Sequence, residues 1–133
     1  MLDKRVPSYM SELRIGISGW SYPHWKGHFY PRELKNEDRL AFYSKRFDTV
    51  EINSTFYGLP KPSVLNRWKE SVPSGFLFAV KGNRLFTHQQ YLRTNAGDVT
   101  SFFRAMEVLD GKLGPVLFQL PPNRSCELPA LAS

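Results

Sequence analysis

Short apolar runs alternate along this chain with longer segments in which apolar residues recur every three or four positions. The short runs have the length and composition of strands, and they lie at 14–18, 49–53, 76–81 and 116–120. The longer segments predict amphipathic helices at 36–47, 62–72 and 99–109. Asn36 and Asp98 are the predicted N-caps of the first and third helices. Strand and helix repeat at steps of about 30 to 40 residues, which predicts parallel βα units.

The two faces of each predicted strand differ in polarity, because side chains alternate along a strand. One face is apolar throughout and carries Ile15, Ile17, Val50, Ile52, Phe76, Phe78, Val80, Val116, Phe118 and Leu120. The other face begins with small residues and ends with polar ones, namely Gly16, Ser18, Glu51, Asn53, Ala79, Lys81, Leu117 and Gln119. We expect the apolar face to meet the helices and the polar residues to gather at the carboxyl ends of the strands.

Two parallel α/β architectures compete for this pattern. A doubly wound sheet is buried on both faces and usually carries a glycine-rich phosphate turn after its first strand. Here the first turn is the bulky segment GWSYP at 19–23. A (β/α)₈ barrel has a repeat of roughly 30 residues and holds its chemistry at the carboxyl ends of its strands. The sequence therefore predicts an α/β fold made of parallel βα units of a TIM-type barrel, with about four of the eight repeats.

Composition and charge narrow the class of partner. The 133 residues carry a formal net charge of +6, which favours an anionic small molecule or nucleic acid, although the charge could serve solubility alone. The single cysteine, Cys126, excludes an internal disulfide and is typical of a reducing compartment, so we expect a cytoplasmic protein. No apolar run approaches ~20 residues, so no membrane partner is expected.

Several separate motifs occur in a recognisable order. They are IGISGWSY at 15–22, WKG at 25–27, FYP at 29–31, FDTVEINSTFY at 47–57, FAVK at 78–81, TH at 87–88 and KLGPVLFQLPP at 112–122. With these motifs the chain resembles the family catalogued as domain of unknown function 72, also called YecE-like. The resemblance implies a fold similar to TIM barrels, and it implies no particular activity.

The resemblance covers about residues 14–122, whereas family members usually run to roughly twice the length of this chain and complete the barrel. On this interpretation 1–13 is a disordered N-terminal extension, 14–122 is a partial barrel and 123–133 is a tail outside the family. A lesion in the gene or a deliberate fragment would explain the short chain. Half a barrel leaves two sheet edges unpaired, so self-association is expected.

Glu51 is the first candidate for a catalytic residue. A carboxylate on the inner face of a buried strand costs free energy unless it is satisfied or used. Glu51 could act as a general acid or base, with Lys81 on the next strand holding a phosphate or carboxylate. The alternative is a structural ion pair between Glu51 and Lys81, because neighbouring strands lie about 4.8 Å apart.

The predicted ligand-binding residues share the carboxyl mouth with these two, and they are Ser18, Trp20, Asn53, Tyr57, His88 and Gln119. Asn53 and Gln119 could hydrogen-bond a polar ligand or satisfy loop backbone, and Ser18 could be structural only. Trp20 and Tyr57 belong to aromatic groups that could stack on a sugar or nucleobase. The alternative is that the aromatic residues after the first strand build a small core of their own.

Metal chemistry receives little support from the sequence. His24 and His88 could join Glu51 as ligands for zinc, manganese or iron. No pair of these residues has the tight spacing of a metal motif, so no metal ligand is assigned and the cofactor stays unknown.

Three functional hypotheses follow. The first is a barrel-type protein that acts on a polar or anionic small molecule or sugar. It would be an enzyme if Glu51 serves as its general acid or base. The second is a binding module for phosphate-rich ligands or nucleic acid, based on the net charge of +6 and the aromatic mouth. The third is an inactive fragment whose mouth is incomplete.

Overall fold

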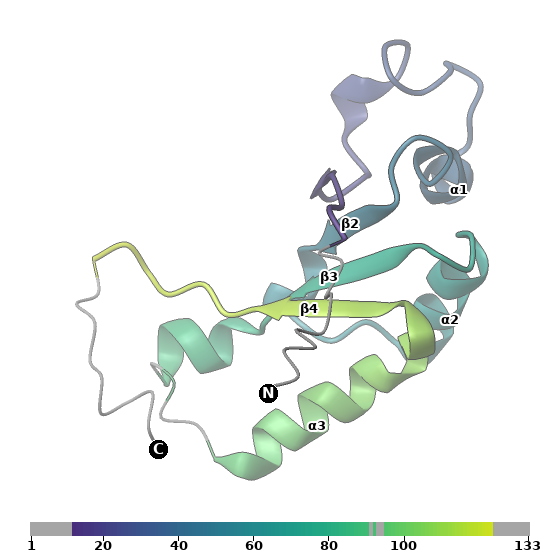
Figure 1. Ribbon diagram of the computed structural model, residues 1–133. Coiled ribbons are helices and arrows are strands. Elements are labelled where there is room, and N and C mark those ends of the chain that lie inside the picture. The colour runs from purple at the N-terminus through teal and green to yellow at the C-terminus, as the bar shows by residue number, and fades with distance from the viewer. Residues whose placement is uncertain (1–11, 91, 93–94, 124–133) are drawn as a thin grey trace, which may run out of the picture.

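A four-stranded parallel sheet lies at the centre of the structure, which is a computed structural model that describes residues 12–90, 92 and 95–123 (Figure 1). The strands are β1 (Gly16–Ser18), β2 (Thr49–Ile52), β3 (Leu77–Lys81) and β4 (Leu113–Leu117), in the spatial order β1-β2-β3-β4. The predicted α/β fold of parallel βα units is therefore confirmed.

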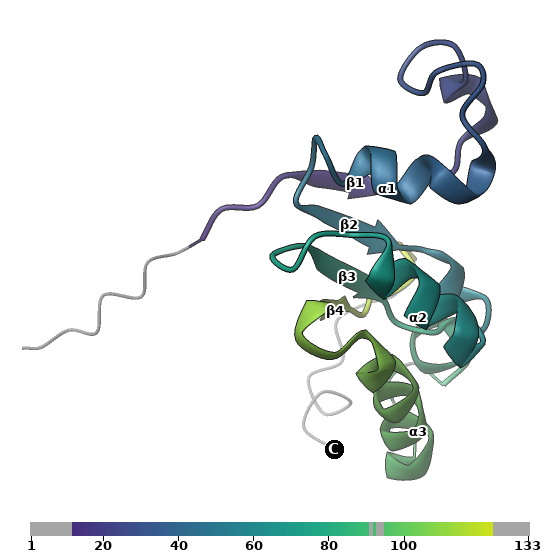
Figure 2. The same cartoon turned by 90° about the vertical axis from the view of Figure 1, so that its right-hand side faces the viewer.

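Helices connect the strands and lie along one face of the sheet (Figure 2). The α-helices are α1 (Arg39–Tyr43), α2 (Pro62–Glu70) and α3 (Ala96–Met106). Shorter helical turns are η1 (Pro23–Trp25), η2 (Asn36–Asp38), η3 (Ser54–Phe56), η4 (Leu85–Gln89) and η5 (Glu107–Lys112). Successive parallel strands that advance in one direction along a sheet place their crossovers on the same face, because such crossovers have a fixed hand. None of the helices in the described ranges has the length and apolar character needed to cross a membrane.

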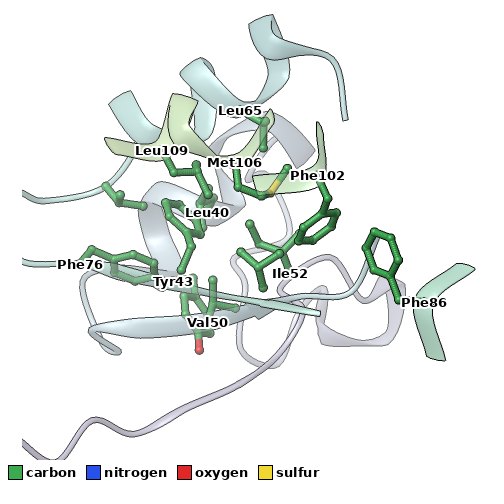
Figure 3. Packing of buried hydrophobic residues seen from close by; sticks show 13 residues of the cluster. Leu40, Tyr43, Val50, Ile52, Leu65, Phe76, Phe86, Phe102, Met106 and Leu109 are labelled. Carbon is green, nitrogen blue, oxygen red and sulfur yellow. The ribbon is translucent and has the colours of Figure 1, made fainter. Parts of the chain in front are cut away.

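The hydrophobic core lies between the sheet and this helical layer (Figure 3). Val50, Ile52, Phe78 and Val80 are at most 1% exposed, which confirms the predicted apolar face on β2 and β3. They pack with residues of the helical layer, which include Leu40, Tyr43, Leu65, Phe102, Met106 and Leu109. Burying an apolar side chain of this size contributes about 1.5–3 kcal/mol, so this layer supplies the main stabilisation of the sheet.

The outer strands depart from the predicted burial. Ile15 is 66% exposed and Ile17 is 36% exposed, because β1 has a strand neighbour on one side only within the described residues. The last strand begins earlier than predicted and ends at Leu117, so that Phe118 and Leu120 follow it. Phe78 pairs with Leu113 and Val80 pairs with Val116, so β4 holds one residue more than β3 over this stretch. Such a bulge accommodates a proline, here Pro115, which has no N–H for the ladder.

Two predicted helix caps are wrong. Asn36 lies inside η2 and makes no capping bond, and the first predicted helix is divided into η2 and the short helix α1. Helix α3 starts three residues earlier than predicted, since its N-cap is Asn95 and Asp98 lies in its first turn. The Asn95 side chain accepts a hydrogen bond from the backbone N–H of Asp98 at 2.8 Å.

Candidate functional site

A chain of hydrogen bonds joins three predicted site residues where β1 and β2 end. Ser18 is the register partner of Glu51, and its Oγ donates to Oε1 of Glu51 at 2.9 Å. The Asn53 amide Nδ2 donates to the same Ser18 Oγ at 2.6 Å. The three side chains meet because they share one strand parity and because the ends of adjacent parallel strands lie at the same edge of the sheet.

Close packing of β1 on β2 sets this register. A Cβ atom at Gly16 would clash with the backbone carbonyl of Thr49, so only glycine fits at this position. Tyr43 of α1 connects the same two strands from the helical side. Its hydroxyl accepts a hydrogen bond from the Ile17 N–H at 3.0 Å and donates one to the Thr49 carbonyl at 2.9 Å.

Lys81 does not pair with Glu51. Within the described residues no ion pair joins the two side chains, and the register partner of Glu51 on β3 is Ala79. The alternative of a structural Glu51–Lys81 ion pair is therefore wrong. The Lys81 ammonium instead lies 5.2 Å from the centre of the Phe56 ring, a cation–π arrangement.

Thr55 positions the ends of β2 and β3, a role that the sequence pattern did not indicate. Its side chain is fully buried, and its hydroxyl lies 2.9 Å from the Ile52 carbonyl and 2.6 Å from that of Lys81. Asn83 adds a hydrogen bond to the Thr55 carbonyl at 3.1 Å. The only signal in the sequence was a threonine two residues after the predicted end of the strand.

Phe56 is the centre of a second group at the same edge. Its ring lies 5.1 Å from the rings of both Tyr57 and His88, measured between centres. Tyr57 is 73% exposed. The His88 ring is positioned by a hydrogen bond between its Nδ1 atom and the Thr87 hydroxyl, at 2.8 Å. Lys81, Tyr57 and His88 thus surround Phe56, and the Glu51–Ser18–Asn53 chain forms a separate group.

The other predicted site residues and the possible metal ligands are not brought together. Gln119 is exposed after β4 and joins neither group by a hydrogen bond among the described residues. His24, His88 and Glu51 do not come together, and residues 12–90, 92 and 95–123 contain no cluster of three metal-ligating side chains.

The aromatic residues after β1 build their own small core, which was the alternative to a stacking surface. The Trp25 ring lies 4.8 Å from Tyr22, 5.4 Å from Phe29 and 5.8 Å from Tyr30 between ring centres. Tyr30 is 1% exposed, and its hydroxyl donates to the Trp20 carbonyl at 2.6 Å. Burial raises the pKa of Tyr30 to about 12.

The Trp20 ring packs on α2. The ring meets Trp68 of α2 edge-to-face, with 5.0 Å between ring centres. Trp20 and Asn53 both line a cavity beside α2, together with Arg67 and Trp68. Sequence reasoning missed the last two residues, because Trp68 fits the apolar stripe of a helix and Arg67 is one of many basic residues.

Known proteins resemble this chain over most of its length. A family model described as "Protein of unknown function DUF72" matches residues 14–133. UPF0759 protein YecE of Escherichia coli K12 is 36% identical over 120 residues, which cover 90% of this chain and 42% of that protein. UPF0759 protein YunF of Bacillus subtilis is 29% identical over 121 residues, which cover 86% of this chain and 42% of that protein.

Solved structures show the same fold. A DUF72 family protein of Thermotoga maritima aligns with a TM-score of 0.75 and 28% identity, over 90% of this chain and 48% of that one. A DUF72 family protein of Enterococcus faecalis aligns with a TM-score of 0.69 and 23% identity, over 90% and 43%. The chain therefore spans less than half the length of these relatives.

Proposed function

Because this chain belongs to the DUF72 family of proteins of unknown function, as its motifs predicted, we propose a function from its own side chains. The carboxyl edge of the sheet acts on a polar or anionic small molecule or sugar. Glu51 is the general acid or base, Asn53 orients the ligand and Lys81 neutralises its negative charge.

The hydrogen-bond chain Glu51–Ser18–Asn53 carries this proposal. A carboxylate offers about four acceptor positions, and Ser18 occupies one of them. The Asn53 amide holds the Ser18 oxygen at 2.6 Å, which directs the serine proton toward Glu51 and keeps the carboxylate in place. A carboxylate held by neighbours and half-buried at a strand end has the placement that acid/base catalysis requires.

The surroundings of Lys81 support the anionic ligand. Among the described residues no carboxylate lies within ion-pair distance of its ammonium, so its charge is available to a phosphate or carboxylate. The aromatic face of Phe56 stabilises the cation without neutralising it.

The test is the variant Glu51→Gln in the full chain. A panel of sugars and phosphate esters would be screened for turnover by NMR. Loss of a positioned acid/base lowers the rate about 10²–10⁴-fold, so we expect this loss with Glu51→Gln. Glu70→Gln, an exposed carboxylate of α2, is the matched control and should keep the rate. Full turnover by Glu51→Gln would remove Glu51 from the chemistry.

A binding module for phosphate-rich ligands or nucleic acid is the second candidate. The net charge of +6 and the exposed ring of Tyr57 favour it. Such a module binds without turnover, and its affinity falls steeply with salt, which separates it from the first candidate. The third hypothesis, an inactive fragment, predicts neither binding nor turnover.

A further inference from the structure

A cavity of about 670 Å³ opens at the carboxyl edge of the sheet, between the segment that follows β1 and helix α2. Helices α1 and α2 lie next to each other on this flank of the sheet (Figure 2). The walls come from the segment after β1, from η2, α1 and α2, and from the end of β2, and they include Trp20, Glu37, Leu40, Asn53, Arg67 and Trp68. Ligand clefts typically have 300–1,000 Å³, so the cavity has room for a small molecule.

The inner part of this cavity is apolar and aromatic. Leu40 and Ile52 are at most 2% exposed and belong to the hydrophobic core. The rings of Trp20 and Trp68 are set at 89° to one another. The face of an indole ring carries partial negative charge, and the C–H face of a sugar ring is weakly positive, so the two attract each other.

The rim of the cavity carries groups that bind hydroxyls and anions. Arg67 and Glu37 are exposed there, and neither has an ion-pair partner within the described ranges. The planar guanidinium of arginine matches the two oxygens of a phosphate or carboxylate. A carboxylate such as that of Glu37 accepts hydrogen bonds from hydroxyl groups.

Asn53 lines the cavity and has a side-chain acceptor without a hydrogen-bond partner among the described residues. Its Oδ1 atom is buried and accepts no hydrogen bond from the described residues. Leaving a buried acceptor unsatisfied costs free energy, because the atom has lost its hydrogen bond to water. A ligand hydroxyl entering beside Asn53 is a donor that would recover this cost.

We propose that this cavity binds a sugar ring that bears one anionic group. The ring packs on Trp20 and Trp68, its hydroxyls bind Glu37 and Asn53, and Arg67 pairs with its phosphate or carboxylate. The proposal rests on the proposed function, for which it names the ligand class. It gives the anionic group to Arg67 in place of Lys81, because Lys81 does not line the cavity. Asn53 links the two proposals, because it lines the cavity and also holds Ser18, the hydrogen-bond partner of Glu51.

Tryptophan fluorescence tests the proposal directly. The chain has three tryptophans, of which Trp20 and Trp68 line the cavity, so a Trp25→Phe background leaves only reporters at the site. This protein would be titrated with glucose 6-phosphate, glucuronate and glucose. We expect a saturable change in emission with one or both anionic sugars and a weaker response to glucose. The two anionic probes distinguish a phosphate from a carboxylate as the group that pairs with Arg67.

Arg67→Gln is the decisive variant, because Arg67 is exposed and its replacement leaves the core unchanged. We expect its affinity for the anionic sugar to fall about tenfold, toward that for glucose. Arg104→Gln removes an equal charge at an exposed position of α3, outside the cavity, and this variant should bind normally. Far-UV circular dichroism would verify that both variants are folded. No saturable change with any probe, or an equal loss in both variants, would overturn the proposal.

Glu51→Gln separates this proposal from the proposed function. Normal binding of the anionic sugar with lost turnover supports both. Normal binding with unchanged turnover overturns the role of Glu51 and leaves the cavity as the binding site. Turnover by a protein whose tryptophans respond to no probe overturns the cavity alone.

Discussion

Single buried polar residues connect neighbouring segments of this molecule. Tyr43 bridges β1 and β2 through its hydroxyl, and Thr55 bridges the ends of β2 and β3. Arg39 is 5% exposed and stacks its guanidinium 5.2 Å from the Tyr30 ring centre. Each of these side chains places a polar atom inside the packed layers, where a partner is needed to offset desolvation.

Tyr30 makes stability depend on alkaline pH. Burial raises its pKa from 10.0 to about 12, and the charge of Arg39 opposes this rise in part. The unfolded chain therefore loses this proton first, so the stabilisation is complete below about pH 10 and is lost as pH rises through about 12. Thermal melts at intervals between pH 8 and 12 should show a smaller fall in Tm for Tyr30→Phe than for the unchanged chain. Tyr57→Phe, at an exposed tyrosine, is the control, and an identical fall in all three proteins would refute this account.

The sequence predicted the presence of helices and strands better than it predicted where the helices end. The alternation in β2 and β3 and the apolar stripes of α2 and α3 identified these elements, because each periodicity is a local property. Helix ends were predicted less well, since Asn95 and Asp98 are both good capping residues and lie within one turn. Local sequence does not choose between them, whereas the structure does so with Asn95 as the cap and with Phe102 and Met106 of the same helix packed into the core.

The cap of α3 can be tested by paired substitutions. Asn95 accepts from the Asp98 N–H and donates to the Asp98 carboxylate, both at 2.8 Å. Asn95→Ala should lower the free energy of unfolding by about 1 kcal/mol in urea denaturation. Asp98→Ala should cost less, because it leaves the capping bond to the backbone intact, and exposed Thr100→Ala is the control. A larger loss with Asp98→Ala than with Asn95→Ala would contradict the observed cap.

At the scale of the molecule, the sheet is covered on one side only by the described residues. The helical layer packs on the face that carries Val50 and Phe78, and the residues of the other face are exposed or half-buried. Exposed apolar side chains gather at the outer strands, namely Leu13, Ile15, Ile17, Leu117, Phe118 and Leu120. Unpaired edges and apolar surface of this kind favour association with another chain.

Self-association of the 133-residue chain is the resulting prediction. Light scattering coupled to size exclusion should give a mass above 15.4 kDa that rises with concentration. Leu117→Lys, at a 45% exposed residue of β4, should shift the equilibrium toward the monomer. Leu59→Lys changes a 47% exposed residue away from the strands and should have little effect. A monodisperse monomer with cooperative unfolding would contradict the prediction.

The sequence by itself determined the class of fold and which residues lie at the strand ends. Side-chain alternation placed Glu51 and Asn53 on one face and Ser18 at the end of its own strand, and alternation is a local property. Tertiary structure decided which of them touch. The strand register pairs Glu51 with Ser18, and Lys81 lies beside Phe56. Arg67 and Trp68 of α2 line the same cavity as Asn53. Register and helix rotation depend on contacts between distant segments, which no periodicity within one segment records.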